Sequence, residues 1–247
     1  MKRFAFFLSA LSLVILSACG GGKSTNEQAG DQSGKTAEQT DGHKHDHSDE
    51  AHKKQEAMAS EVAMNNEVQP GDYVEDFELK NLDGGTTSMD DYEEAKGFVL
   101  IFSCNHCPYV KASEDRMIAL HNKMKPKGYP VVAINSNDTS GGNQADSYEN
   151  MKIRAQEKGF PFAYLRDKSQ EVARRFGAEK TPHVYLVRKD DEGYRVVYTG
   201  AIDDNVRNAE KVTVNYVEEA IEALENGQQP QPQTTKAIGC SLKYTEA

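Results

Sequence analysis

Near the middle of the chain stands the stretch Phe98-Val-Leu-Ile-Phe-Ser-Cys-Asn-His-Cys-Pro-Tyr109. Its first five residues form a continuous apolar run, which is typical of a strand buried on both faces. Residues 108–125 are predicted to form a helix, because Met117, Leu120 and Met124 fall on one helical face. Two cysteines separated by two residues therefore stand where a buried strand ends and a long helix begins.

The position of Cys104 and Cys107 favours thiol–disulfide chemistry. A thiolate at a helix N-terminus meets unpaired backbone N–H groups and the positive end of the helix dipole, and both lower its pKa. His106 adds a nearby partial positive charge, which acts in the same direction. We therefore expect Cys104 to be the exposed, ionised nucleophile. Cys107, one turn into the helix, is expected to be buried and to resolve the mixed disulfide.

Three other roles compete for this cysteine pair. A zinc site needs about two more ligands, which Cys240 and a histidine would have to supply from spacings that do not suggest such a site. Attachment of a c-type haem requires a histidine directly after the second cysteine, and Pro108 excludes it. A purely structural disulfide between these cysteines would close a very short loop, which gains little chain entropy. Redox exchange is the prediction that remains strongest.

The elements on either side complete an alternating pattern. Further strands are predicted over residues 130–134, 162–165, 184–187 and 194–198, of which the last two form a hairpin. Further helices are predicted over residues 146–158, 169–176 and 211–226, with Ser169 as an N-cap. Alternating strands and helices that end in a hairpin and a helix indicate an α/β fold, with a mixed central β-sheet flanked by helices.

The N-terminus has the features of an export signal. Lys2 and Arg3 precede an apolar run over residues 4–15, and Leu16-Ser-Ala-Cys19 follows. The run is shorter than the ~20 apolar residues that span a bilayer. The ending resembles the bacterial lipobox, which implies a signal peptide over residues 1–18 and diacylation of Cys19. Since two acyl chains anchor a protein stably, we expect a lipid-anchored protein of the bacterial cell envelope, facing the periplasm or lying on the outer membrane.

A polar segment separates this anchor from the predicted domain. Residues 19–66 contain almost nothing to bury and are expected to be a disordered tether. The tether contains four closely spaced histidines, which are either a metal-binding tract or part of a solvated linker: His43, His45, His47 and His52. Residues 67–227 are then expected to form the folded domain, followed by a tail over residues 228–247 that contains Cys240.

Charge and composition narrow the class of protein. The chain has 29 Lys and Arg against 39 Asp and Glu, for a net charge of −10 over 247 residues, which argues against a nucleic-acid partner. A hydrophobic fraction of 37% is low for a wholly globular chain, as expected if one part packs no core. With four cysteines, the chain is not a disulfide-dense miniature scaffold.

Three motifs lie within residues 68–226. They are Pro70-Gly-Asp-Tyr-Val-Glu-Asp-Phe77 followed by Leu82-Asp-Gly84, the segment Phe102-Ser-Cys-Asn-His-Cys-Pro-Tyr109, and Thr181-Pro182 before an apolar strand. Together they resemble the thioredoxin superfamily, and more narrowly its redoxin group of AhpC/TSA-like and peroxiredoxin-like proteins. The resemblance implies a thioredoxin-like fold. It also implies a cis-proline loop at Thr181-Pro182 that lies against the cysteine pair and offers backbone groups to a substrate peptide.

The chain also departs from the patterns of its relatives. Ser103 stands where thioredoxin has Trp, and residues 97–102 contain no acid to accept the proton of the second cysteine, for which His183 is a speculative substitute. Peroxiredoxins carry Pro-x-x-x-Thr/Ser-x-x-Cys and a nearby Arg. Relative to Cys107, this chain has Leu100 in place of the Pro and Cys104 in place of the Thr or Ser, and Thr181-Pro182-His183 lies near the expected place of the Arg.

These features favour an extracytoplasmic thiol–disulfide oxidoreductase. Its catalytic residues are predicted to be Cys104, Cys107 and His106, its partners are protein thiols and disulfides, and no cofactor or metal is assigned to it. The alternatives are a peroxiredoxin-like thiol peroxidase and a metal-handling module. The tail resembles the ends of some redoxin-group proteins with an extra cysteine, so Cys240 is either a second resolving thiol that docks back on the active site or a spare tail thiol.

Overall fold

The computed structural model describes residues 67–140 and 144–245. The predicted signal peptide, the acylated Cys19 and the histidines of the tether lie outside the described residues. In the part of the chain that is described, none of the helices has the length and apolar character needed to cross a bilayer.

A mixed sheet of eight strands forms the centre of the domain. In spatial order its strands are β1 (Tyr73–Val74), β9 (Gly193–Gly200), β8 (His183–Asp190), β4 (Gly97–Phe102), β5 (Val131–Asn135), β6 (Ala163–Arg166), β2 (Leu79–Asn81) and β3 (Thr86–Thr87). β4 pairs parallel with β5 and antiparallel with β8. The apolar run that opens the active-site stretch is thus a central strand, and every residue of β4 is buried, as predicted.

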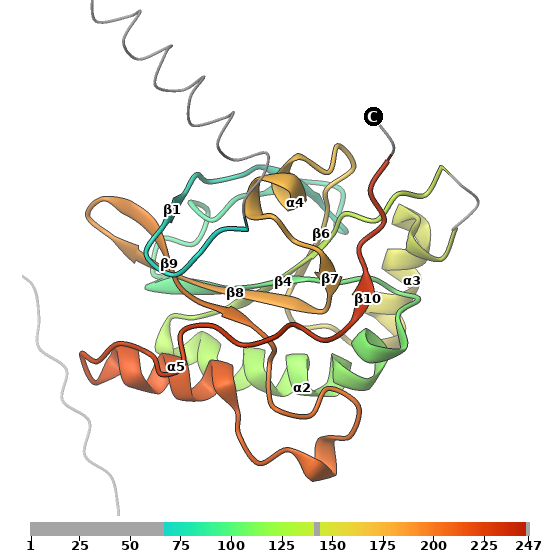
Figure 1. Ribbon diagram of the computed structural model, residues 1–247. Coiled ribbons are helices and arrows are strands. Elements are labelled where there is room, and N and C mark those ends of the chain that lie inside the picture. The colour runs from blue at the N-terminus through green and yellow to red at the C-terminus, as the bar shows by residue number, and fades with distance from the viewer. Residues whose placement is uncertain (1–66, 141–143, 246–247) are drawn as a thin grey trace, which may run out of the picture. The chain divides into compact units, whose positions relative to one another are not determined.

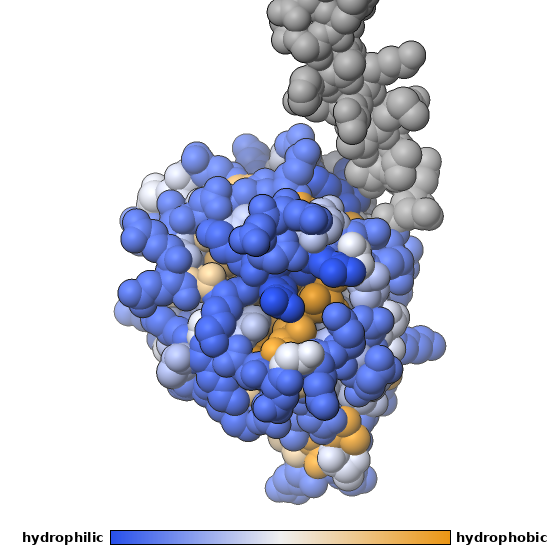
Figure 2. Space-filling model, turned by 90° about the vertical axis from the view of Figure 1, so that its left-hand side faces the viewer, coloured by the Kyte–Doolittle hydropathy of each residue, from blue (hydrophilic) through white to orange (hydrophobic). Residues whose placement is uncertain are grey.

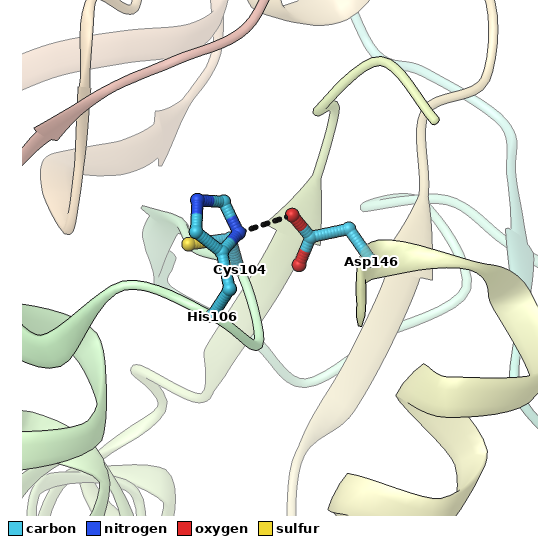
Figure 3. A group of neighbouring side chains, drawn as sticks. All are labelled: Cys104, His106 and Asp146. Carbon is cyan, nitrogen blue, oxygen red and sulfur yellow. Dashed lines mark hydrogen bonds and ion pairs between the residues drawn. The ribbon is translucent and has the colours of Figure 1, made fainter. Parts of the chain in front are cut away.

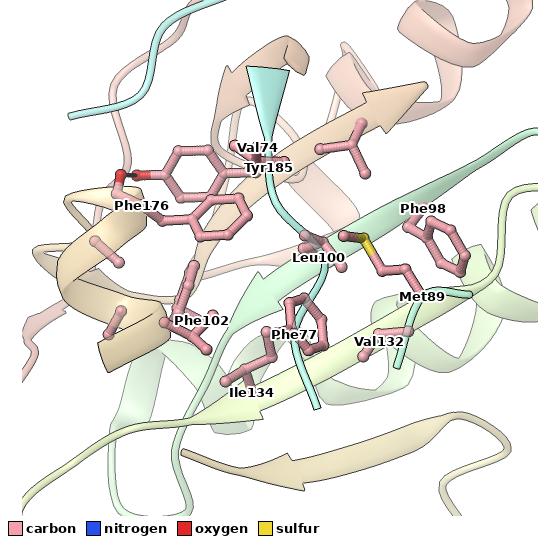
Figure 4. Close-up of a cluster of buried hydrophobic side chains, with 14 of the residues drawn as sticks. Val74, Phe77, Met89, Phe98, Leu100, Phe102, Val132, Ile134, Phe176 and Tyr185 are labelled. Atoms are coloured by element: carbon pink, nitrogen blue, oxygen red, sulfur yellow. Dashed lines mark hydrogen bonds between the residues drawn. The ribbon is translucent and has the colours of Figure 1, made fainter. Parts of the chain in front are cut away.

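Helices cover both faces of this sheet (Figure 1). On one face lie α2 (Pro108–Met124), α3 (Tyr148–Lys158) and α5 (Tyr216–Glu225), whose apolar side chains pack with Val99, Ile101 and their neighbours. On the other face α4 (Glu171–Phe176) and the N-terminal strands cover a second cluster, which is drawn in Figure 4. The α/β architecture predicted from the sequence is confirmed.

The face of the domain seen in Figure 2 is mostly polar. Among the described residues, the large hydrophobic side chains that remain exposed are Tyr73, Ile153 and Ile238. The apolar side chains of the domain are therefore mostly used in its two core clusters.

Two predicted helix starts differ from the structure. Ser169 does not cap α4; its N-cap is Gln170, which has a φ of 63°. The last helix begins at Tyr216 rather than at residue 211, and Ala209–Lys211 forms a separate 3-10 turn. Val212, Thr213 and Val214 are β-branched and lose side-chain freedom in a helix. The backbone N–H of Thr213 donates to Asp204 instead, which holds this segment outside the helix.

Phe102→Ala is expected to lower the free energy of unfolding by about 3–5 kcal/mol. The ring is fully buried and packs against Phe176 and Tyr185, with centroid separations of 5.6 and 5.7 Å. Its removal leaves a cavity beside the end of β4. The measurement is urea unfolding of the full chain, with Ile153→Ala as the control, because Ile153 is 52% exposed. Equal effects of the two changes would contradict this placement of the core.

The C-terminal tail returns to the domain. After α5 it follows the sheet, where Thr234 bridges to Thr199, and it ends in β10 (Cys240–Ser241) (Figure 1). β10 pairs antiparallel with β7 (Lys180–Thr181), and Leu242 is buried in the second core cluster. The tail thus brings Cys240 to the end of β4, where the other two described cysteines lie.

Candidate active site

The two cysteines of the central stretch lie under other parts of the chain. β4 ends at Phe102, and Cys107 is the N-cap residue of α2. Cys104 is 1% exposed and Cys107 is 0% exposed. The prediction that Cys104 is exposed is therefore wrong, whereas the predicted burial of Cys107 is confirmed. Cys104 is covered because residues distant in sequence fold over it.

One of the covering segments is the loop at Thr181-Pro182. The peptide bond between these residues is cis, as the resemblance implied. Thr181 Oγ1 lies 3.3 Å from Cys104 Sγ, and the carbonyl oxygen of Thr181 lies 3.2 Å from Cys107 Sγ. Thr181 therefore contacts both sulfurs, through its side chain and its backbone. The expected position of this loop against the cysteine pair is confirmed.

The second covering segment is β10. Cys240 Sγ lies 2.7 Å from Cys107 Sγ, and the three described cysteines form one cluster with Val110. Cys240 pairs in register with Thr181, so the tail strand lies directly beside the cis-proline loop. Of the two readings of Cys240 left open by the sequence, the one in which it docks back on the active site agrees with this geometry.

The pKa values of the two buried sulfurs are shifted in opposite directions. A hydrogen bond from the Cys104 thiol, aided by the Cys240 thiol and the backbone N–H of Val110, lowers the pKa of Cys107 to about 4 despite its desolvation. The pKa of Cys104 is raised, because it donates to Cys107, is buried and lies near the carboxylate of Asp146. Backbone N–H groups at the helix N-terminus favour both thiolates: that of Val110 lowers the pKa of Cys107, and that of Cys107 acts in the same direction on Cys104.

Reduced protein is expected to show one thiolate that forms near pH 4. Ultraviolet absorbance of the thiolate, followed during an acid titration, measures it. The same titration should lack this step in Cys107→Ser and retain it, shifted to higher pH, in Cys104→Ser, because that variant loses the thiol donor. A step that disappears only in Cys104→Ser would contradict the assignment.

His106 contacts a buried acid that the sequence analysis missed (Figure 3). Its Nδ1 lies 2.5 Å from a carboxylate oxygen of Asp146, which is 0% exposed. The backbone N–H of Asn105 and the side chain of Asn137 also donate to Asp146, at 2.7 and 2.9 Å. Burial raises the pKa of Asp146, but these donors and His106 outweigh it and hold that pKa below its ordinary value.

A buried acid does lie near the pair, but beside the first cysteine: the charge of Asp146 acts on the Cys104 thiol. It comes from the 3-10 turn Gln144–Asp146, after β5, and not from β4. No local sequence pattern marks it, because Asp146 follows His106 by 40 positions. His183, the suggested substitute, faces other groups: its Nε2 lies 3.1 Å from Thr199 Oγ1 and 3.1 Å from a Glu67 carboxylate oxygen.

The same groups offer ligands for a metal ion. Cys104 Sγ, a ring nitrogen of His106 and a carboxylate oxygen of Asp146 lie within 4.8 Å of one another. Sulfur, nitrogen and oxygen ligands of this kind suit zinc, which takes four ligands and can accept water as the fourth. The zinc alternative weighed from the sequence would have used Cys240 and a histidine, so the structure moves its donor set to His106 and Asp146.

Comparison with known proteins places the chain among redox proteins. The sequence profile of the AhpC/TSA family matches residues 70–198. A crystal structure of an uncharacterized conserved protein from Geobacillus kaustophilus is similar over 74% of this chain and 95% of its own, with 37% identity and a TM-score of 0.67. A hypothetical protein from Sinorhizobium meliloti is similar over 74% of this chain and 98% of its own, with 28% identity and a TM-score of 0.67. A search of the curated proteins found no match.

Proposed function

The chain belongs to the AhpC/TSA family and has a thioredoxin-like fold, and from this we propose that it is a thiol–disulfide oxidoreductase whose Cys104–Cys107 pair exchanges disulfides with other proteins. The single observation that carries the proposal is the place of the pair: both sulfurs lie at the N-terminus of α2 and contact Thr181 of the cis-proline loop. A buried thiol, Cys104, donates to a sulfur with a pKa of about 4, Cys107, at a helix N-terminus. An ionised sulfur is the nucleophile and the better leaving group in disulfide exchange.

His106 and Thr181 are the other residues that act on the cysteine pair. In the reduced pair, oxidation to the disulfide requires Cys104 to lose its proton. The imidazole of His106, whose Nδ1 is bound by Asp146, lies beside this sulfur and is the acceptor that we assign. The contacts of Thr181 with both sulfurs fix their positions relative to the loop. His106 thus takes the role of proton acceptor in place of the predicted tuning of the Cys104 pKa, Thr181-Pro182 keeps the predicted role of orienting the partner chain, and Asp146 is added as a positioning residue.

The lowered pKa of Cys107 also bears on the direction of electron transfer. A low pKa stabilises the reduced form of a cysteine pair, which makes the couple more oxidising. We therefore propose that the oxidised pair accepts electrons from protein dithiols more readily than ordinary disulfides do. The Leu16-Ser-Ala-Cys19 motif supports an extracytoplasmic, lipid-anchored location on the bacterial cell envelope, where such partners are exported proteins.

A second candidate is a thiol peroxidase. Cys107 stands at the peroxidatic position of the peroxiredoxin pattern, with Cys104 in place of the Thr or Ser, and its lowered pKa of about 4 suits attack on a peroxide. This candidate differs from the first in the oxidant that it consumes.

One experiment separates the two functions. Oxidised full chain is mixed with a reduced protein such as reduced insulin, and reduced full chain is mixed with hydrogen peroxide; the loss of free thiols from the reduced protein is followed in each case. Exchange with the reduced protein, lost in the double variant Cys104→Ser/Cys107→Ser, supports the proposal. Fast oxidation by peroxide with slow exchange would favour the peroxidase. Equal rates for the wild type and the double variant in both assays would overturn both functions.

A further inference from the structure

The tail makes a third cysteine part of the active site. We propose that Cys240 is the sulfur at which external protein thiols exchange with the buried Cys104–Cys107 pair. This role rests on the function proposed above and deepens it, because it assigns the route by which electrons enter.

The tail strand is fastened closely to the loop beside the pair. At Gly239 an added Cβ would lie 2.1 Å from the carbonyl oxygen of Thr181, so the two backbones are in direct contact. Directly after β10, the backbone N–H of Leu242 donates to the carbonyl oxygen of Glu179, and that of Lys243 donates to the side chain of Asn137, each at 2.8 Å. The position of Cys240 over Cys107 is therefore held by contacts on several elements.

Exposure distinguishes the three sulfurs. Cys104 and Cys107 are 1% and 0% exposed, whereas Cys240 is partly exposed. An incoming thiolate must reach a disulfide sulfur along the axis of the bond that breaks. Among the described cysteines, Cys240 is therefore the one that a protein partner can reach while the tail stays docked. Its sulfur is also 2.7 Å from Cys107, which allows direct exchange between the two.

The exchange balances without a further oxidant. The Cys240 thiolate attacks Cys107 Sγ of the Cys104–Cys107 disulfide; the bond between those two sulfurs breaks, its electron pair leaves with Cys104, and a Cys107–Cys240 disulfide forms. A thiolate of a protein dithiol then attacks Cys240 Sγ, and Cys107 leaves as a thiolate. The second thiolate of the partner attacks its own sulfur in this mixed disulfide, and Cys240 leaves and takes up a proton. The partner is oxidised and one disulfide of this chain is reduced.

Disulfide mapping tests the inference directly in the full chain. Protein oxidised in a glutathione redox buffer is acid-quenched, its free thiols are alkylated, and its disulfides are mapped by peptide mass spectrometry. We expect a Cys107–Cys240 disulfide beside Cys104–Cys107 in the wild type, and Cys107–Cys240 alone in Cys104→Ser. Absence of Cys107–Cys240 from both would overturn the inference, even if the wild type exchanges with protein disulfides.

Turnover gives the second readout. Cys240→Ser is expected to oxidise a reduced protein substrate at least about tenfold more slowly than the wild type, since it loses the accessible sulfur. Ser241→Ala is the matched control, because it changes the neighbouring exposed residue of the same strand and should keep the wild-type rate. A loss of less than tenfold in Cys240→Ser would overturn the inference. If the wild type itself does not turn over, the proposed function fails, and the disulfide map alone decides the role of Cys240.

Discussion

Cys107→Ser is expected to slow disulfide exchange by at least about 30-fold at pH 7. Exchange would then depend on a remaining cysteine, and a cysteine of ordinary pKa near 8.5 is only a few per cent ionised at that pH. In the wild type, Cys107 carries the negative charge of the pair, with a pKa of about 4. It also lies 2.7 Å from Cys240 and accepts the hydrogen bond of Cys104, so both proposed disulfides use its sulfur. The rate of oxidation by a protein disulfide in a single turnover measures the effect.

Cys104→Ser is the matched comparison for that result. It keeps the ionisable sulfur at the N-terminus of α2 and the contact with Cys240. It should therefore still complete a single turnover, through a Cys107–Cys240 disulfide. If Cys104→Ser loses the reaction and Cys107→Ser keeps it, Cys104 is the attacking sulfur, as the sequence alone had predicted, and the assignment made from the structure fails.

Asp146→Asn is expected to lower the free energy of unfolding by about 1–3 kcal/mol at neutral pH, the range for leaving buried hydrogen-bond donors without their acceptor. The carboxylate is 0% exposed and accepts hydrogen bonds from Asn105 and Asn137 in addition to its contact with His106. An amide in its place turns one acceptor into a donor, which faces donors already present. Urea unfolding of the full chain measures the change, with the exposed Asp115→Asn as control.

The pH dependence gives this prediction a second test. The pKa of Asp146 is lowered in the folded state, so its stabilising contribution is fully present above its unfolded value of about 3.9. The contribution is lost as the pH falls through the folded value. The difference between wild type and Asp146→Asn should therefore shrink below pH ~4. A difference that stays constant down to pH ~2 would mean that the charge of Asp146 does not stabilise the fold.

The fold was largely predictable because its signals are local. The apolar run that became β4 and the helical spacing that became α2 each depend on residues close together in the chain. The residues that cover Cys104 gave no such signal. Thr181 follows Cys104 by 77 positions, and Cys240 follows Cys107 by 133, so the burial of the pair depends on chain segments that periodicity cannot relate.

The last helix shows the same limit at a smaller scale. The apolar spacing predicted a helix from residue 211, but Thr213 donates to Asp204, nine positions earlier, and the helix begins at Tyr216. A side-chain acceptor brought by the preceding loop competed with the helical hydrogen bond. The apolar residues predicted the helix itself correctly, whereas the residue at which it begins depended on the contact between Thr213 and Asp204.

The sequence by itself determined that two thiols stand at a strand-to-helix junction, and that an α/β domain with a cis-proline loop surrounds them. Only the tertiary structure decided that both thiols are buried, which acid supports His106, and that Cys240 completes the cluster. The physical reason is that pKa and reactivity depend on burial and on hydrogen-bond partners within a few ångströms. Those partners, such as Asp146 at 40 positions from His106, are brought together by folding and not by spacing in the chain.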